Sequence, residues 1–368
     1  MSQTAPIAVY GATGYTGRLV VKELRRRGLA FVLCGRDPDK LRAAAASAGA
    51  PEVRVAAVGD RDALRHAFGD CVAVINCAGP FTVVGEPVVR AAVETGTHYV
   101  DTTGEQPFIK LVVDRFDEAA RAAEVAVVPA MGFDYVPGDL ICRVAARDHE
   151  PLTVLNLAYA VSGFGATRGT LRSALEAMKG DDVVWEDGAW HDAGAGPLRS
   201  RVVFPEPVGR AVAAKYPCGE VVSVPRHTRV RTIRARIAVS GIVPAGPFAP
   251  LVPPVMAGLG AGLRTPVRRS LQAVIGMLPE GPSEEARRAS RFLIVVAAEG
   301  ANGSSGRGEV RGEDLYALTA VCTVHAASLL AAEGYYRSGV LSAASAFDPV
   351  AFLDHLTGHG VSWRVSPA

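Results

Sequence analysis

The sequence lacks a large excess of charge of either sign. Its 39 lysine and arginine residues nearly balance its 37 aspartate and glutamate residues, and the formal net charge is +2. Basic and acidic tails are absent, as is any internal repeat. We therefore expect no nucleic-acid partner, because binding to a phosphate backbone needs a basic surface. The hydrophobic fraction of 49% is typical of a soluble globular protein.

Paired cysteines and a secretory signal are also absent. The six cysteines form no C-x-x-C motif, and several lie in apolar runs, where a thiol behaves as a small hydrophobic group. The amino-terminal stretch MSQTAPIAVYGATG has neither the basic n-region nor the apolar h-region of a signal peptide. We expect reduced thiols and a cytoplasmic location.

Several catalytic and binding motifs are missing. None of the nine tyrosines has a lysine four residues later, so the Tyr-x-x-x-Lys dyad of short-chain dehydrogenases is absent and ketone reduction by that route loses support. His355 and His359 lie four residues apart but outside any H-E-x-x-H motif, and we interpret them as surface residues. No Walker loop is present, and we expect no metal site.

Apolar runs of strand length alternate with helix-like stretches in the first third of the chain. This pattern is typical of parallel strands joined by crossover helices, as in a Rossmann-type doubly wound α/β sheet. At 368 residues the chain is also long enough for a second domain. The predicted strands are Ile7–Tyr10, Ala30–Gly35, Val53–Val58, Val72–Cys77, His98–Asp101 and Val125–Pro129.

A glycine-rich segment, GATGYTG, lies between the first predicted strand and an amphipathic helix. Glycine permits close backbone approach, and the N–H groups at a helix start favour phosphate. The spacing is G-x-x-G-x-x-G, yet its setting predicts a dinucleotide site rather than a turn that binds nothing. The predicted cofactor contacts in this segment are Gly11, Thr13, Gly14, Tyr15, Thr16 and Gly17.

The end of the second strand selects the cofactor in such sheets. A carboxylate there binds the ribose hydroxyls of NAD, whereas an arginine binds the additional phosphate of NADP. This strand ends in Cys34-Gly35-Arg36, and the following Asp37 precedes Pro38, as a helix N-cap does. We therefore predict NADP(H), with Arg36 at the 2′-phosphate or stacked on the adenine. A solvated arginine at a strand end is the alternative.

Further segments carry a family resemblance. GATGYTG is followed by GRDPDKL, INCAGPF, YVDTTGE and GFDYVPGDL, which resemble the saccharopine dehydrogenase-like oxidoreductases in order and spacing. Later in the chain, SGFGATRGT, EGPSEEAR and GEDLYALTA resemble the branch that contains trans-acting enoyl reductases. The resemblance implies hydride transfer from NADPH to an unsaturated acceptor.

The A-G-P-F turn of this family lies along the cofactor toward its nicotinamide. The position of the turn at the carboxyl end of the fourth strand agrees, because ligands of such sheets bind there. The implied cofactor contacts are Cys77, Ala78, Gly79, Pro80 and Phe81. In YVDTTGE, at the same edge, Asp101 or Thr102 is either a cap or a further cofactor contact.

Beyond the first third, β-rich stretches joined by loops rich in glycine and proline predict an α+β domain with a mixed sheet. We place the dinucleotide-binding domain at 1–147, the substrate domain at 148–312 and a helical segment at 313–368, which the resemblance places against the first domain. Within that last segment we expect a loop at Arg337–Leu341.

The second domain holds candidates for substrate and partner binding. Arg168 and Thr170 precede a helix-like run and either bind an anionic or carbonyl group of the substrate or form a capping turn. The arginines between Arg229 and Arg236 change parity along a strand, which indicates a β-bulge. They form either a docking surface for a carrier protein or a solvated strand face.

A long uncharged stretch, Ile237–Leu263, is interrupted by prolines and therefore does not predict a membrane-spanning helix. It forms either an apolar lip for a lipid-like substrate, a peripheral membrane contact or a buried loop. The sequence leaves the oligomeric state undetermined.

The proton donor has three candidates. Reduction of C=C or C=N needs a hydride and a proton, and a general acid has to lie within hydrogen-bond reach of the atom that takes the proton. Asp134, Tyr135 and Tyr316 can supply it, or they form a cap and packed aromatics. We favour an enoyl reductase acting on a small-molecule or carrier-bound acyl chain. An imine or amino-acid reductase and a non-catalytic cofactor-binding protein stay open.

Overall fold

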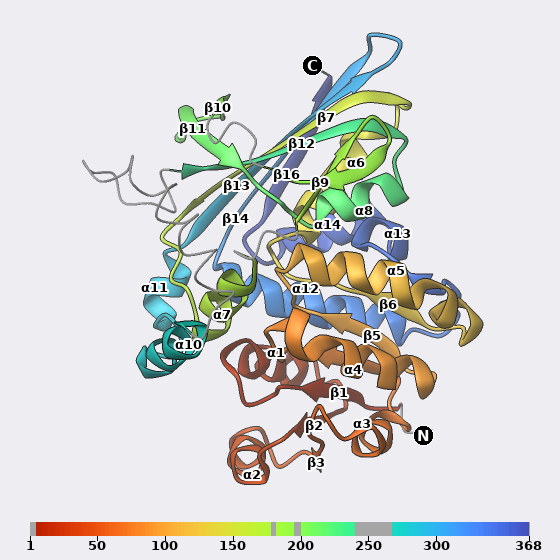
Figure 1. Ribbon diagram of the computed structural model, residues 1–368, viewed down its shortest axis with the longest axis vertical. Helices are drawn as coiled ribbons and strands as arrows, with labels where there is room; N and C mark the ends of the chain where they lie inside the picture. The colour runs from red at the N-terminus through yellow and green to blue at the C-terminus, as the bar shows by residue number, and fades with distance from the viewer. Residues whose placement is uncertain (1–4, 178–181, 195–199, 240–266, 368) are drawn as a thin grey trace. The chain divides into compact units, whose positions relative to one another are not determined.

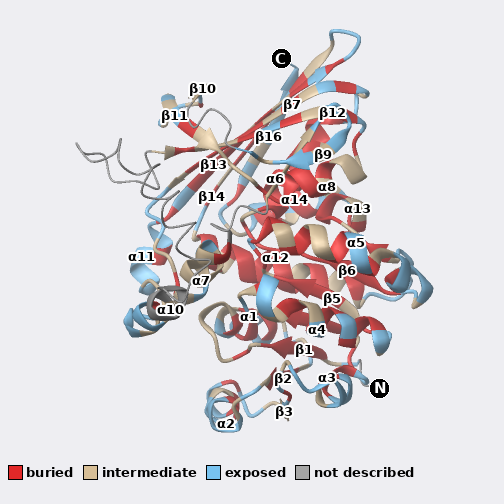
Figure 2. Ribbon diagram, viewed as in Figure 1, coloured by how far each residue is buried: buried red, intermediate tan, exposed pale blue. Residues whose placement is uncertain are grey.

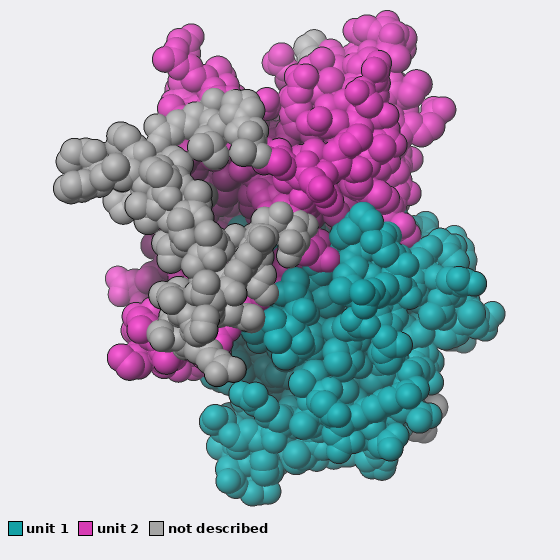
Figure 3. Space-filling model, in the orientation of Figure 1, with its two compact units in different colours: residues 1–104, 108–136, 316–347 teal, residues 105–107, 137–315, 348–368 magenta. Residues whose placement is uncertain are grey.

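Figure 1 shows the computed structural model of the chain, in which residues 5–177, 182–194, 200–239 and 267–367 are described. The described residues form two compact units, which Figure 3 colours separately. Unit 1 comprises the described residues of 1–104, 108–136 and 316–347. Unit 2 comprises those of 105–107, 137–315 and 348–368.

Unit 1 is built on a seven-stranded parallel sheet with the order β15-β6-β5-β4-β1-β2-β3. Its central strands are fully buried, as expected where helices cover both faces. The strand order reverses between β1 and β4, which confirms the predicted doubly wound sheet. The strands are β1 (Ile7–Tyr10), β2 (Phe31–Gly35), β3 (Val53–Val55), β4 (Ala73–Asn76), β5 (His98–Asp101), β6 (Ala126–Val128) and β15 (Gly339–Val340).

Right-handed crossovers place α1 and α2 on one face of this sheet and α3, α4 and α5 on the other. The predicted N-cap of α2 is confirmed, because Asp37 accepts a hydrogen bond from Lys40 N at 3.1 Å. Asp60 caps α3 in the same way and accepts a hydrogen bond from Ala63 N at 3.0 Å. The helices of unit 1 are α1 (Tyr15–Arg26), α2 (Pro38–Ser47), α3 (Arg61–Phe68), α4 (Phe81–Glu94), α5 (Gln106–Ala122), α12 (Leu315–Leu330) and α13 (Ala343–Ala346).

Unit 2 contains a seven-stranded mixed sheet with the order β10-β11-β12-β7-β13-β14-β16, in which only β7 and β12 pair in parallel. The predicted mixed sheet is thereby confirmed. Figure 2 shows buried, intermediate and exposed residues mixed along these strands. The strands are β7 (Leu152–Ser162), β10 (Ser200–Val203), β11 (Arg210–Lys215), β12 (Val230–Ala238), β13 (Arg291–Gly300), β14 (Ser305–Glu313) and β16 (Ser362–Pro367).

The remaining elements of unit 2 are a β-hairpin and short helices. The hairpin pairs β8 (Val183–Glu186) with β9 (Ala189–Asp192). The helices are α6 (Val136–Ala146), α7 (Arg168–Ala177), α8 (Glu220–Ser223), the 3₁₀ helix η1 (Val224–Arg226), α10 (Val267–Met277), α11 (Glu284–Arg288) and α14 (Pro349–Thr357). Across the described part of the chain, no helix has the length and apolar character needed to span a membrane.

The boundaries of the two compact units differ from the domain boundaries that we expected from the sequence. Helix α6 belongs to unit 2 from Pro137 onward, because its small residues pack on the mixed sheet. The tail is shared between the units. Residues 316–347 belong to unit 1, whereas 348–368 belong to unit 2, where β16 pairs with β14. The loop expected at Arg337–Leu341 contains β15, which pairs with β6.

The arginine-rich strand β12 pairs with β7 in one continuous register from Val230 to Ile237, so the predicted bulge is wrong. The edge of β12 has two neighbours along its length: Gly188 N of the β8–β9 hairpin donates to Arg231 O at 2.8 Å, and β11 pairs with Arg236–Ala238. Of the uncharged stretch Ile237–Leu263, the part from 240 onward lies outside the described residues.

Unit 2 buries a glutamate beside α6. Glu220 is 0% exposed, and its Oε1 accepts a hydrogen bond from the Tyr159 hydroxyl. Gly138 makes room for this contact, since a Cβ there would lie 2.0 Å from Glu220 Oε1. Oε2 has no hydrogen-bond partner among the described residues. Burial raises the pKa of Glu220 to about 8, which favours the neutral acid at pH 7.

We expect Glu220→Gln to flatten the pH dependence of stability. The wild-type free energy of unfolding should fall as pH rises from 4.5 to about 8, because only the folded state keeps the Glu220 proton in that window. One such group contributes up to about 1.4 kcal/mol per pH unit. Urea unfolding from about pH 5 to about pH 9 measures the slope, with Glu285→Gln as the exposed control. Equal slopes for wild type and Glu220→Gln would contradict the expectation.

Candidate cofactor and catalytic site

Two helices of unit 1 begin without a side-chain cap. Helices α2 and α3 are capped by aspartates, whereas α1 and α4 have no side-chain cap and no acidic residue in the first turn. Both uncapped helices follow the central strands β1 and β4, between which the strand order reverses. Ligands of doubly wound sheets bind at this position, and an uncapped helix start offers N–H groups and a positive dipole end to a phosphate.

In the glycine-rich turn before α1, the fold itself requires glycine at positions 11 and 17, whereas Gly14 borders open space. Gly11 has φ +80°, and a Cβ at Gly17 would lie 2.3 Å from Gly11 O, so a side chain at Gly17 collides with the turn itself. A Cβ at Gly14 would meet only Gly11 O, at 3.4 Å. The protein therefore tolerates a side chain at Gly14, and the open space above it fits the pyrophosphate of a dinucleotide.

The neighbouring residues of this turn are held by unit 1 itself. The carbonyl of Thr13 accepts a hydrogen bond from Arg18 at 2.7 Å. Tyr15 lies edge-to-face against Tyr316 at the start of α12, with ring centroids 5.3 Å apart. Tyr316 therefore supports the cofactor turn from a segment about 300 residues later in the chain, which sequence spacing alone does not reveal.

Arg36 lies at the end of β2, at the same edge of the sheet. Its side chain is exposed and makes neither a hydrogen bond nor an ion pair within the described part of the chain. Because Asp37 caps α2, its carboxylate is engaged by the helix rather than held for a ribose. This arrangement leaves the guanidinium available for a phosphate and agrees with the predicted NADP(H).

The A-G-P-F turn leads from β4 into α4. Ala78 N donates to Asn76 Oδ1 at 2.9 Å, which orients the turn. Phe81 is buried and packs on Phe108 with centroids 5.7 Å apart, so its ring belongs to the core. Burial raises the pKa of Cys77 to about 12 and keeps its thiol protonated. Cofactor contacts at this turn would therefore come mainly from Ala78, Gly79 and backbone groups.

Asp134 lies in the turn that follows β6. Its side chain is partly accessible, yet the surrounding protein desolvates the carboxyl group and raises its pKa to about 7. Thr319 of α12 holds the turn, because its Oγ1 accepts a hydrogen bond from Phe133 N at 3.1 Å. Gly104 lies close to the carboxyl group, since a Cβ at this glycine would be 3.3 Å from Asp134 Oδ2. A carboxyl group with this pKa can serve as a general acid near neutral pH.

Tyr135 is the second candidate acid. Its ring is 4% exposed, and its hydroxyl donates to Gly104 O at 2.8 Å. This bond engages the phenolic proton and ties the Asp134 turn to the residues after β5. Among the three candidate proton donors, Asp134 thus carries a carboxyl group whose pKa is raised to about 7.

Arg168 and Thr170 belong to unit 2 and serve the start of α7. Thr170 N donates to Thr167 Oγ1 at 3.0 Å, which is the capping turn considered as the alternative. The Arg168 guanidinium donates to the carbonyl of Leu278, and its backbone N–H donates to Glu280 O at 3.0 Å. Their predicted substrate contacts stay predictions.

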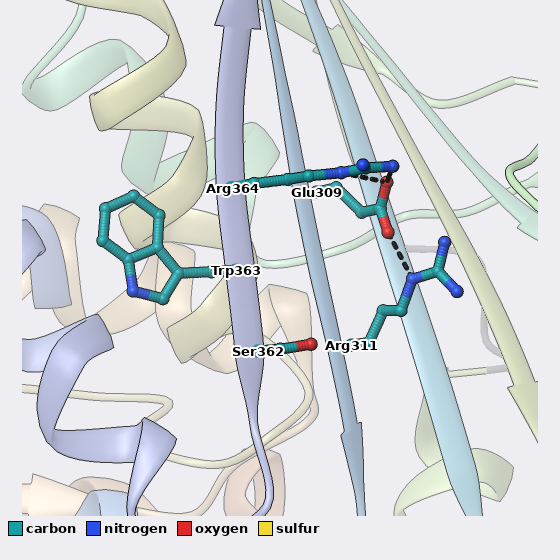
Figure 4. Close-up of a pocket in the computed structure, with 5 residues that line it drawn as sticks. All are labelled: Glu309, Arg311, Ser362, Trp363 and Arg364. Atoms are coloured by element: carbon teal, nitrogen blue, oxygen red, sulfur yellow. Dashed lines mark hydrogen bonds and ion pairs between the residues drawn. The ribbon is translucent and has the colours of Figure 1, made fainter.

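Figure 4 shows a hollow of about 240 Å³ on unit 2 between β14 and β16. Glu309 lies between the guanidinium groups of Arg311 and Arg364. Burial favours protonation of Glu309, but the hydrogen bonds from both arginines outweigh it and lower the pKa of the carboxyl group. Because these charges satisfy each other, we interpret the hollow as an ion-pair cluster of the sheet. The described residues contain no cluster suited to a metal ion.

Comparison with known proteins agrees with this site. The saccharopine dehydrogenase NADP binding domain matches residues 7–128. The human saccharopine dehydrogenase-like oxidoreductase is 23% identical over 424 residues, covering 98% of this chain and 96% of that protein. The trans-acting enoyl reductase of Mycobacterium ulcerans (strain Agy99) is 33% identical over 186 residues, which cover 47% of this chain and 44%, less than half, of that protein.

The whole fold matches apo histidine-tagged saccharopine dehydrogenase (L-Glu forming) from Saccharomyces cerevisiae, with a TM-score of 0.62 over 98% of this chain and 100% of that chain. At 14% identity this likeness shows the fold alone. A dinucleotide-binding unit of this kind makes the chain an NAD(P)-dependent oxidoreductase. More narrowly, the chain is similar to the saccharopine dehydrogenase-like oxidoreductases, and its cofactor is NADP(H). The predicted resemblance and cofactor are thereby confirmed.

We expect Gly14 and Gly17 to respond oppositely to substitution. Gly14→Val should leave the melting temperature nearly unchanged and weaken NADPH binding by more than about tenfold, because only the cofactor needs the space above Gly14. Gly17→Ala should lower the melting temperature, since the new Cβ collides with Gly11 O. Thermal unfolding and NADPH fluorescence titration measure both effects. Normal NADPH binding by Gly14→Val would show that the turn does not carry the pyrophosphate.

We expect Arg36→Ala to weaken NADPH more than NADH. Loss of a charge-assisted bond to the 2′-phosphate should cost about 1–3 kcal/mol for NADPH and nearly nothing for NADH. Calorimetric titration of both cofactors measures the difference, with Arg42→Ala as a control that removes an exposed arginine from α2. Equal losses for the two cofactors would remove Arg36 from the phosphate site.

Proposed function

We propose that this oxidoreductase reduces the C=C bond of an enoyl group on a largely apolar acyl chain, either free or attached to a carrier. The observation that carries the proposal is the carboxyl group of Asp134, whose pKa of about 7 keeps a proton available at the carboxyl edge of the dinucleotide-binding sheet. The similarity to a trans-acting enoyl reductase over about half of the chain supports the same reaction.

In this proposal, some residues of unit 1 bind the cofactor and Asp134 donates the proton. The turn at Gly14 and Arg36 would hold the pyrophosphate and 2′-phosphate, and the turn at Ala78 would orient the nicotinamide end. NADPH, when bound, supplies two electrons and a hydrogen to one carbon of the double bond. Asp134 donates the proton to the other carbon, so that the acceptor gains two hydrogens in total and the Asp134 carboxylate is later reprotonated from water.

Reduction of an amino-acid imine is the second candidate, and the fold likeness to saccharopine dehydrogenase is its support. Such an acceptor carries carboxylates, which need cationic partners when they are desolvated. The guanidinium of Arg168, the candidate for that task, already donates to the Leu278 carbonyl. The contact uses one of the five N–H donors of the guanidinium, and we favour the less charged acceptor because of the similarity to a trans-acting enoyl reductase.

The direct test is NADPH oxidation with matched acceptors. We would compare 2-enoyl thioesters of increasing chain length with cyclic imines and 2-oxo acids plus amines, and identify products by mass spectrometry. Turnover that rises with acyl chain length supports the proposal. Turnover confined to imines or to amino-acid pairs would overturn it, and binding of NADPH without turnover of any acceptor would indicate a non-catalytic role.

We expect Asp134→Asn to remove a pH dependence of turnover. Because the acid has to be protonated, wild-type kcat should be constant below pH 7 and fall above it, as the carboxyl with a pKa of about 7 loses its proton. The asparagine variant should be slower by about 10²–10⁴-fold and show no such limb. Stopped-flow NADPH oxidation from about pH 5.5 to about pH 9 measures this. Asp60→Asn, which keeps a helix cap, is the control.

A wild-type rate that stays level across pH 7, or an Asp134→Asn variant with an unchanged rate, would exclude Asp134 as the acid. Tyr135→Phe and Tyr316→Phe then separate the remaining candidates, because each removes one hydroxyl and retains its ring.

A further inference from the structure

A chain of buried hydrogen bonds connects the cofactor turn with the residues around Asp134. Ala78 N donates to Asn76 Oδ1 at 2.9 Å, and Asn76 Nδ2 donates to the Tyr99 hydroxyl at 3.1 Å. The Tyr99 hydroxyl in turn donates to Asp101 Oδ2 at 2.9 Å. Asn76, Tyr99 and Asp101 are all 0% exposed. The chain therefore runs inside unit 1 across the carboxyl ends of β4 and β5.

Each hydrogen bond in this series runs in the same direction, and the series ends at the Asp101 carboxylate. The other carboxylate oxygen, Oδ1, accepts from Thr103 N at 2.9 Å and from Ala130 N at 2.8 Å. Burial and the nearby Asp101 charge raise the pKa of Tyr99 well above its ordinary value, so its hydroxyl keeps the proton that it donates. A carboxylate that accepts three hydrogen bonds is the strongest acceptor that this position can hold.

These bonds hold three separate turns. Asp101 Oδ1 binds the turn after β5 through Thr103 and the turn after β6 through Ala130, which has φ 62°. The backbone carbonyl of Asp101 also accepts from Met131 N at 2.7 Å. Through Tyr99 and Asn76 the same carboxylate reaches the turn that contains Ala78. One side chain thus connects the cofactor turn with the turn that carries Asp134.

We propose that Asp101 is a positioning residue which, acting through Tyr99 and Asn76, sets the place of Asp134 relative to the nicotinamide turn. The inference rests on the proposed function in one respect, since Asp134 is there the proton donor. Its structural part concerns unit 1 alone. The network adds buried side-chain bonds to those that Tyr135 and the Asp101 carbonyl already make between these turns. A displacement of about 1 Å between reacting groups can lower a rate by about 10²-fold.

Tyr99→Phe tests the connection while keeping the ring in the core. The substitution removes one hydroxyl, so that Asp101 Oδ2 and Asn76 Nδ2 lose their shared partner, while the bonds from Ala78, Thr103 and Ala130 remain. Asp101→Asn is the second variant. Its amide would donate to the Tyr99 hydroxyl, which would then face two donors and lose the acceptor for its own proton.

Thr97→Val is the matched control. Thr97 is 1% exposed and lies just before β5, at the opposite end from Asp101, and its hydroxyl donates to Phe68 O at 3.1 Å. The control therefore also removes a buried hydroxyl hydrogen bond, but away from the three turns. A rate loss that follows from lower stability alone should appear in Thr97→Val as well.

We expect the two network variants to lower the rate of turnover while leaving NADPH binding nearly unchanged. Tyr99→Phe and Asp101→Asn should lower kcat by about tenfold or more and change the Kd of NADPH by less than about threefold. The midpoint of the pH limb above neutrality should move down toward the ordinary carboxyl range, because a loosened turn admits water to Asp134. Thr97→Val should leave kcat and this midpoint within about twofold and about 0.3 pH units of wild type. Unchanged kcat in both network variants, or an equal loss in the control, overturns the inference.

Hydrogen exchange measured by mass spectrometry distinguishes failure of this inference from failure of the proposed function. In Tyr99→Phe, the amides of the turns after β4, β5 and β6 should all exchange faster than in the wild type, whereas the amides of residues 11–17 should exchange at the wild-type rate. In Thr97→Val, the amides of all these segments should exchange at the wild-type rate. This readout needs no acceptor. Faster exchange without enoyl turnover in the wild type would refute the proposed reaction and retain the network. Unchanged exchange in Tyr99→Phe would refute the network whatever the substrate.

Discussion

The uncapped starts of α1 and α4 are the constraint on which the site of this protein depends. Both helices begin where the strand order reverses, and neither takes a cap from its own sequence, whereas α2 and α3 are capped by Asp37 and Asp60. Two positive helix ends therefore lie side by side at the carboxyl edge of β1 and β4. A dinucleotide phosphate satisfies them, so cofactor binding follows from how the sheet is wound.

The proposed proton delivery by Asp134 depends on burial, just as cofactor binding depends on the helix ends. Around Asp134, desolvation shifts the carboxyl group toward its neutral form, and the turn that carries it is held by Thr319 and by the network that ends at Asp101. Asp101 keeps three hydrogen bonds and works as an acceptor. Asp101 at the end of β5 and Asp134 in the turn after β6 therefore differ, because one carboxyl group accepts hydrogen bonds and the other is desolvated.

Unit 2 contributes a mixed sheet with a paired cluster of charges, in which Glu309 lies between two arginines. In the same unit, Arg168 donates to a backbone carbonyl. The buried Glu220 shows that the unit also tolerates a neutral acid in its core.

The sequence by itself determined the parallel sheet, the glycine turn, the cap at Asp37 and the cofactor NADP(H), because these depend on periodicity and on residues close together in the chain. The tertiary structure alone decided what depends on distant contacts. Tyr316 supports Tyr15, Asn76 and Tyr99 lead to Asp101, and α6 joins the second unit. No local pattern carries such information, since burial and partners arise only when remote segments pack together.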